Sequence, residues 1–238
     1  MDDILAKCDI LCLQEHWLHS FEKKDLIDLF PKFRSIIKCA DDDMPVLPEL
    51  RTPIRHGTAI LWNEDIDKYV EALNIGSHRL CAIKLHCSPP LLIICTYMPT
   101  QGSTNGVYED ILAEVQVTIA AYDECIPIWA GDINASTNRI RKTSNDVLFT
   151  DFCQENHLQM HPLTPSLPTF HHSNGLGGES RIDMFITRPQ DTDIITAINV
   201  LERDPINVGC HDPVIASLSV HLPKEPHILV ADVDRPPR

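Results

Sequence analysis

The chain has 238 residues, a length that fits one large domain or two small ones. With 43% hydrophobic and 23% charged residues it can bury a core, which excludes a globally disordered, collagen-like or coiled-coil protein. Its formal net charge of −14 argues against a protein whose main task is to coat nucleic acid, because neutralising phosphates requires a basic surface. An enzyme that holds a cation and contacts only a few phosphates is compatible with this charge.

Apolar runs and cysteines indicate the compartment. The longest dense apolar stretch, residues 91–95, is far shorter than the roughly 18 residues of a membrane helix, and the acidic first residues do not resemble a secretory signal. The nine cysteines show no C-x-x-C pair, so free thiols in a reducing compartment are expected. We therefore predict an intracellular protein, cytoplasmic or nuclear, that is not secreted and has no membrane partner.

Short runs rich in Ile, Val, Leu and Tyr predict most of the secondary structure. Helical spacing of apolar residues predicts three helices, at residues 21–30, 108–122 and 146–157. The apolar runs predict nine strands, at residues 9–13, 33–37, 58–62, 80–85, 91–97, 126–130, 181–186, 194–201 and 214–220. This mixture predicts an α/β (α+β) fold in which sheets pack on sheets and helices lie outside.

Three segments interrupt this pattern. Residues 39–55 contain three consecutive aspartates and three prolines, which predicts a surface excursion. Residues 223–238 are rich in proline and charge, and we interpret them as a linker or tail after a domain at residues 1–222. The first residues look like the end of a helix that runs straight into a strand. The domain is therefore predicted to be N-terminally truncated and to lack its first strand.

The first chemical signal is a polar tip on an apolar strand, Ile10-Leu-Cys-Leu-Gln14-Glu15. A carboxylate at the end of a buried strand loses hydration unless it meets a cation or hydrogen-bond donors, so Glu15 is a candidate ligand for a hard metal ion. The alternative is that Glu15 caps the next helix or pairs with a lysine.

A second apolar strand leads into the tight turn Gly131-Asp132-Ile133-Asn134. Glycine allows the backbone to turn close to a ligand, and side chains two positions apart on extended chain point the same way. Asp132 and Asn134 can therefore converge on one point, although an ordinary Asx turn would look the same.

Two further signals lie nearer the C-terminus. Asp183 stands within an otherwise apolar strand, and His211 stands at the start of another. A buried aspartate needs a partner, and a carboxylate often orients an imidazole or keeps it charged beside a phosphate.

Taken in order, these motifs resemble those of the endonuclease/exonuclease/phosphatase superfamily of metal-dependent phosphoesterases. The motifs are L-Q-E at 13–15, Y-M-P at 97–99, G-D-I-N at 131–134, S-R-I-D at 180–183 and C-H-D-P-V at 210–214. The extended Leu-Gln-Glu-His-Trp-Leu at 13–18 and the strand at 56–62 are most similar to the apurinic/apyrimidinic-type endonuclease domain of non-LTR (LINE-type) retrotransposons.

The resemblance implies a four-layer sandwich of two mostly antiparallel β-sheets flanked by helices. It also implies a Mg²⁺ cofactor, with Mn²⁺ as a substitute, a DNA substrate, a monomer, and a reverse transcriptase joined after the proline-rich tail. The implied roles are metal binding for Glu15, positioning or deprotonation of water for Asp132, phosphate contact for Asn134 and Tyr97, and transition-state stabilisation for the pair Asp183 and His211.

One position departs from the family pattern. The family has an aspartate before the final histidine, and this chain has Cys210. A thiol is a poor ligand for magnesium, and Asp212 is expected to point to the opposite face of the strand. The missing first strand would carry a further asparagine in the family. These departures favour one alternative, a catalytically inactive remnant. The other alternative is a phosphatase of the same fold that acts on a small phosphorylated substrate.

A basic cluster follows the Gly-Asp-Ile-Asn turn in this acidic chain. Arg139, Arg141 and Lys142 are predicted to contact DNA phosphates beside the metal site, the alternative being a solvated loop.

Overall fold

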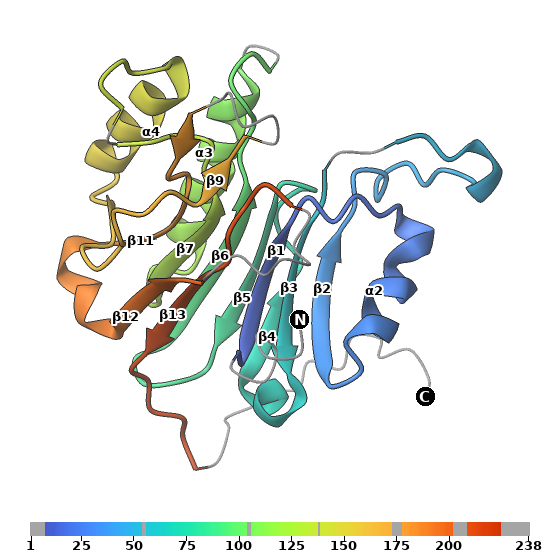
Figure 1. Cartoon of the computed structure of the whole chain (residues 1–238). Helices are drawn as coiled ribbons and strands as arrows, with labels where there is room; N and C mark the ends of the chain where they lie inside the picture. Colours follow the sequence, from blue (N-terminus) through green and yellow to red (C-terminus); the bar gives the residue numbers. More distant parts are fainter. Residues whose placement is uncertain are drawn as a thin grey trace.

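A computed structural model of the chain describes residues 8–53, 56–103, 106–137, 139–172, 178–201 and 209–224. The larger of its two main sheets has six strands in the order β4-β5-β6-β7-β11-β8 (Figure 1). Its strands are β4 Val70–Leu73, β5 Leu80–Leu85, β6 Leu91–Tyr97, β7 Ile126–Asp132, β11 Asp183–Thr187 and β8 Gln159–Met160. Among the described strands of this sheet, β6 and β7 pair in parallel and the other neighbours are antiparallel.

The second main sheet is antiparallel and has the order β1-β3-β2. Its strands are β1 Ile10–Gln14, β3 Thr58–Asn63 and β2 Phe33–Lys38. Two smaller antiparallel pairs accompany it, β9 Phe170–His171 with β10 Glu179–Ser180 and β12 Ile195–Val200 with β13 Val214–Leu218.

Helices cover the outer faces of the sheets (Figure 1). The helices α3 Val107–Ala121 and α4 Ser144–Glu155 lie outside the six-stranded sheet, and α2 Lys23–Leu29 lies outside the three-stranded sheet. Short 3-10 helices connect other elements, namely η1 Ser20–Glu22, η2 Pro48–Leu50, η3 Glu64–Tyr69 and η4 Pro189–Ile194.

Three separate apolar clusters hold the four layers together. One cluster joins α3 and α4 to the six-stranded sheet and includes Trp129 and Phe149. A second fills the space between the two sheets and includes Ile60 and Ile83. A third joins α2 to the three-stranded sheet around Leu61. Three interfaces between packed layers make a four-layer sandwich, as predicted.

Strand β6 shows why the sequence favours this arrangement. All seven of its residues are buried. Leu92 and Ile94 belong to the cluster beneath the helices, whereas Leu91 and Ile93 belong to the cluster between the sheets. Because successive side chains of a strand point to opposite faces, a strand covered on both faces has to be apolar throughout.

The predicted elements are confirmed with small shifts at their ends. Each of the nine predicted strands and three predicted helices has a counterpart. Strand β4 and the two-residue strands β8, β9 and β10 were not predicted, because they are too short or too polar to show a pattern.

Both predicted terminal features lie largely outside the described residues. The suspected truncation concerns residues 1–7, and most of the predicted tail is residues 225–238. The first tail residue is described, and its carbonyl, that of Pro223, accepts a hydrogen bond of 3.0 Å from the Tyr69 hydroxyl. Among the described residues, no helix has the length and apolar character needed to cross a membrane.

Candidate active site

Three predicted site residues form a row across neighbouring strands of the six-stranded sheet. Tyr97 at the end of β6 is in register with Asp132 at the end of β7, and Asp132 is in register with Asp183 at the start of β11. Because β11 runs antiparallel to β7, its first residue lies at the same edge as the last residues of the other two strands. The strand pairing therefore brings these three side chains to one edge.

Gly131 allows β7 to lie close to β6 just before Asp132. Its φ is +140°, and a Cβ at this position would lie 2.0 Å from the Thr96 carbonyl oxygen. No side chain fits so close to backbone, so the glycine is required for the geometry of Asp132.

Asn134 is bound to Asp132 and lies in the left-handed region, with φ +48°. Its backbone N–H donates to Asp132 Oδ1 at 3.0 Å, and its Nδ2 donates to Asp132 Oδ2 at 3.0 Å and to the Met98 carbonyl at 2.8 Å. Asn145, at the start of α4, donates to the carbonyl of Asn134 at 3.3 Å and to that of Pro99 at 3.0 Å. These contacts fix the turn against the end of β6.

His211 pairs with Asp183 across the site. Its Nδ1 lies 2.9 Å from Asp183 Oδ2, and its Nε2 lies 4.0 Å from Asp132 Oδ2. Burial alone would lower the pKa of His211, but the hydrogen bond to Asp183 and the charges of Asp183, Asp132 and Glu15 raise it to about 9. The imidazole is therefore protonated at neutral pH and can donate from Nε2.

The surroundings of Asp132 disfavour the charged form of its side chain. It is 4% exposed, and its burial, together with the nearby charge of Asp183, raises the pKa of its carboxyl well above the usual range. The charge of Glu15 acts in the same direction, whereas His211 opposes it. A buried carboxylate among other carboxylates is stabilised by a cation.

Glu15 reaches the same site from the other sheet. It directly follows β1 and has a φ of +54°, and its Oε1 accepts a hydrogen bond from the hydroxyl of Tyr97. Burial and this carboxylate raise the pKa of Tyr97, so the phenol stays protonated as a donor. The structure thus brings Glu15, Tyr97, Asp132, Asn134, Asp183 and His211 together at one end of the two sheets.

The donor set suits a hard divalent cation. Asp132 and Asp183 each offer a carboxylate oxygen, and these oxygens and a ring nitrogen of His211 lie within 4.8 Å of one another. Because the protonated imidazole has no free lone pair, the carboxylates would hold the cation. Carboxylate oxygens are the groups that Mg²⁺ and Mn²⁺ prefer, and Glu15 supplies a further carboxylate beside them. These residues therefore fit the metal that the sequence predicted.

The segment around Cys210 contacts strand β9, since His211 pairs with Phe170. Cys210 is half-buried, and its carbonyl accepts a 2.8 Å hydrogen bond from the N–H of His171. The carboxylate of Asp212 binds His171 Nε2 at 2.7 Å. Asp212 is therefore engaged with His171, and it does not take the place of the aspartate that the family has at position 210.

The basic cluster divides into two parts. Arg139 donates to Asp146 Oδ1 at 3.1 Å and to the Ser180 hydroxyl at 3.4 Å. Asp146 itself is fully buried at the start of α4. Arg141 and Lys142 are exposed. Of the three cations in this cluster, Arg141 and Lys142 are thus the ones on the surface.

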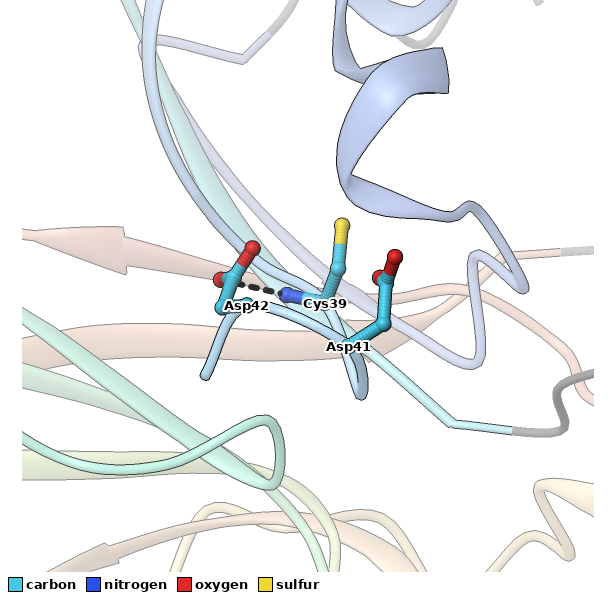
Figure 2. A group of neighbouring side chains, drawn as sticks. All are labelled: Cys39, Asp41 and Asp42. Carbon is cyan, nitrogen blue, oxygen red and sulfur yellow. Dashed lines mark hydrogen bonds between the residues drawn. The ribbon is translucent and has the colours of Figure 1, made fainter. Parts of the chain in front are cut away.

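A second acidic group, Cys39, Asp41 and Asp42, also has ligand atoms within 4.8 Å of one another. Figure 2 shows Asp42 accepting a hydrogen bond from the backbone nitrogen of Cys39, at 2.9 Å. Asp42 also pairs with Lys23 at 2.6 Å, and burial raises the pKa of the Cys39 thiol to about 12. Protein donors already satisfy these carboxylates, and the protonated thiol is a weak ligand. We assign this group a structural role in the loop.

Sequence patterns did not identify the residues that hold the side chains of the site in place. Arg79 and His56 contact Tyr97, and Asn145 holds the turn of Asn134. For Asn145 and Asp146, a signal existed in the capping box that Thr143 and Asp146 form at the start of α4. Arg79 stands in no recognisable pattern, and His56 begins the segment at 56–62 without being singled out there as a site residue.

Comparisons with known proteins show the family and the fold. A model of the Endonuclease/Exonuclease/phosphatase family matches residues 1–205. The structure is similar to the endonuclease domain of TRAS1, a telomere-specific non-LTR retrotransposon, with a TM-score of 0.68 and 16% identity over 91% of this chain and 88% of that one.

Two other solved structures are comparably similar. The 3′ phosphatase NExo from Neisseria, bound to a product DNA hairpin, has a TM-score of 0.65 and 15% identity over 92% of each chain. The AP endonuclease LMAP from Leishmania major has a TM-score of 0.68 and 14% identity over 92% of this chain and 80% of that one. At such identities these structures show a shared fold. The comparison with curated proteins gave no match.

Proposed function

From the premise that the chain belongs to the endonuclease/exonuclease/phosphatase family, we propose that it hydrolyses phosphodiester bonds with Mg²⁺ or Mn²⁺ and nicks DNA as a retrotransposon-type endonuclease. The observation that carries this proposal is the convergence of Asp132, Asp183 and His211 with the Glu15–Tyr97 contact at one end of the two sheets. The similarity to the TRAS1 endonuclease domain and the amino-acid sequences of the motifs favour DNA as the substrate.

The proposed chemistry follows from the positions of these side chains, with Asp132 acting in its ionised form, which a bound cation would favour. Asp132, oriented by two hydrogen bonds from Asn134, accepts the proton of a water molecule that attacks phosphorus. His211, kept protonated by Asp183, donates to a phosphoryl oxygen as its negative charge grows. The bond from phosphorus to the leaving sugar oxygen then breaks, and this oxygen takes a proton from solvent. A bound Mg²⁺ would polarise the phosphoryl group and offset the developing charge.

Glu15 and Tyr97 complete the proposed site. We assign Glu15 to metal binding and Tyr97 to a hydrogen bond that orients Glu15 or the scissile phosphate. We assign Arg141 and Lys142, with a smaller part for Arg139, to contacts with DNA phosphates beside the site.

Two alternatives each have an observation in their favour. Cys210 favours an inactive remnant, because the acid that precedes the histidine in the family is absent. The similarity to a 3′ phosphatase favours hydrolysis of a terminal phosphate.

The test is an assay of supercoiled plasmid with purified protein in Mg²⁺, in Mn²⁺ and in chelator. We expect open-circular product with either metal and none in chelator. Release of inorganic phosphate from a 3′-phosphorylated oligonucleotide, with intact plasmid, would support the phosphatase instead. No product from either substrate with folded protein would support the inactive remnant, and cleavage that survives the chelator would contradict the proposal.

A further inference from the structure

Arg79 is a buried cation that holds Tyr97 at three points. It directly precedes β5 and is 8% exposed. Its guanidinium carbon lies 5.0 Å from the centre of the Tyr97 ring, and its Nη1 donates to the Tyr97 carbonyl at 3.2 Å. Its own carbonyl accepts a hydrogen bond of 2.9 Å from the Tyr97 N–H. The backbone and the ring of Tyr97 are thus both fixed by one residue.

His56 holds Arg79 in turn. The Nη2 of Arg79 lies 3.0 Å from His56 Nδ1. A guanidinium can only donate, so Nδ1 is the acceptor and the proton of this imidazole is on Nε2. Burial and the charges of Arg79 and His78 lower the pKa of His56 to about 4, which keeps it neutral and able to accept.

His56 also anchors the segment that carries Glu15. Its carbonyl accepts a hydrogen bond of 3.2 Å from the backbone N–H of Trp17. Both Glu15 and Trp17 have left-handed backbone angles, with φ +54° and +57°, a conformation that persists only when surrounding contacts impose it. His56 therefore acts on Tyr97 through Arg79, and it contacts directly the chain next to Glu15.

We propose that Arg79 and His56 are positioning residues that hold the Tyr97 hydroxyl against Glu15 and thereby orient the Glu15 carboxylate for a divalent cation. This inference rests on the proposed function. Residues that hydrogen-bond or orient a metal ligand commonly change metal affinity by about 10-fold to 100-fold when they are replaced. Direct contact of Arg79 with substrate is disfavoured, because its guanidinium is buried and engaged with Tyr97 and His56.

The test is a double-mutant cycle on Mn²⁺ affinity, measured by titration of the metal-free protein without substrate. Arg79→Lys keeps the charge but loses the planar fork that binds the Tyr97 carbonyl and His56 together. We expect Arg79→Lys to weaken Mn²⁺ binding about 10-fold in the parent protein. In the Tyr97→Phe background, where the hydroxyl is gone, the same change should have little further effect.

Controls separate positioning from general damage. Arg188→Lys changes another arginine, one that follows the opposite end of β11 and donates to the Cys125 carbonyl at 3.5 Å, and it should leave Mn²⁺ affinity unchanged. Circular dichroism and the thermal midpoint report folding. If Arg79→Lys does not fold, His56→Ala removes the acceptor of Arg79 while retaining the backbone bond to Trp17, and it should weaken Mn²⁺ binding by a smaller factor that also vanishes in Tyr97→Phe.

The outcomes distinguish this inference from the proposed function. Equal losses in the two backgrounds, or no loss in folded protein, would overturn the positioning role. Glu15→Gln tests the metal site itself. If Glu15→Gln weakens Mn²⁺ binding and Arg79→Lys does not, the inference alone fails. If Glu15→Gln has no effect, the metal assignment of Glu15 in the proposed function is wrong.

Discussion

Two groups among the described residues each bring three potential ligand atoms within 4.8 Å of one another, yet their surroundings differ. Asp41 accepts hydrogen bonds from the Ser20 N–H, the Ser20 hydroxyl and the Val46 N–H, at 2.8, 2.9 and 3.2 Å. Burial works against its charge, but these donors lower the pKa of Asp41 below its usual value. Asp132 is similarly buried, and there burial and the charge of Asp183 raise the pKa.

The comparison shows that the number of acids near one another does not identify a metal site. What distinguishes the two groups is whether the protein itself supplies the positive partners that the carboxylates need. The loop at 39–42 has its own donors and the ammonium of Lys23. The strand ends at Asp132 and Asp183 are paired in register, and His211 contacts both carboxylates.

The largest expected difference is the response to loss of each aspartate. Asp132→Ala should reduce plasmid nicking by about 1,000-fold or more, because the attacking water is no longer positioned or deprotonated. Asp41→Ala should leave the rate per folded molecule unchanged but destabilise the protein by about 1–3 kcal/mol, since buried donors lose their acceptor. Initial nicking rates and urea unfolding measure the two effects. Equal losses of rate in both variants would remove the distinction between the groups.

The second prediction concerns the pKa of His211 in the metal-free protein. Asp183→Asn removes the main group that raises this pKa to about 9, so the value should fall by about one unit or more. Histidine C–H resonances followed by NMR through a pH titration measure the shift. An unchanged pKa would show that Asp183 does not control the imidazole.

The pair of His211 and Asp183 also makes the free energy of unfolding depend on pH. The pKa of His211 in the folded protein lies above its ordinary value of about 6.5. The contribution is therefore complete below that pH and is lost as the pH rises through about 9. Urea unfolding of the parent should show this decline and that of Asp183→Asn should show less of it. Parallel pH profiles for the two proteins would contradict the assignment.

Sequence and structure agree where local pattern carries the information. The strand that ends just before Glu15, and the strand that turns at Gly131 before Asp132, follow from short apolar runs with polar ends, and both are found. The register of the strands could not be predicted, because no local sequence pattern indicates that Tyr97 lies beside Asp132 and that Asp132 lies beside Asp183. The contacts of Arg79 and His56 depend on three separate strands meeting, so no spacing in the sequence reveals them.

A smaller effect on the nicking rate and the Mg²⁺ requirement is expected at Cys210. It tests whether the absence of an aspartate at this position weakens the site. Cys210→Asp should lower the Mg²⁺ concentration for half-maximal nicking by about 10-fold and raise the rate, because a hard ligand replaces a thiol beside His211. Cys210→Ser is the matched control, since it changes the sulfur to oxygen without adding charge. If the parent already nicks as fast as Cys210→Asp, the thiol is not a defect.

The smallest effect concerns Arg139, Arg141 and Lys142, the basic cluster that follows the turn of Asp132 and Asn134 in the sequence. Each phosphate contact contributes about 0.9 to the slope of log affinity against log salt concentration. Because Arg141 and Lys142 are exposed, Arg141→Ala with Lys142→Ala should reduce this slope by up to about 2. Arg139→Ala should change the slope less, since that guanidinium is paired with buried Asp146, and should instead lower the thermal midpoint.

The control of equal charge is Lys24→Ala with Lys32→Ala, two exposed lysines at and just after α2, which should leave the slope unchanged. Binding is measured in Ca²⁺ or without metal so that cleavage does not intervene. A slope that is the same in the Arg141–Lys142 variant and in this control would show that the loop is merely solvated, and the phosphate contacts would have to be sought elsewhere on the surface.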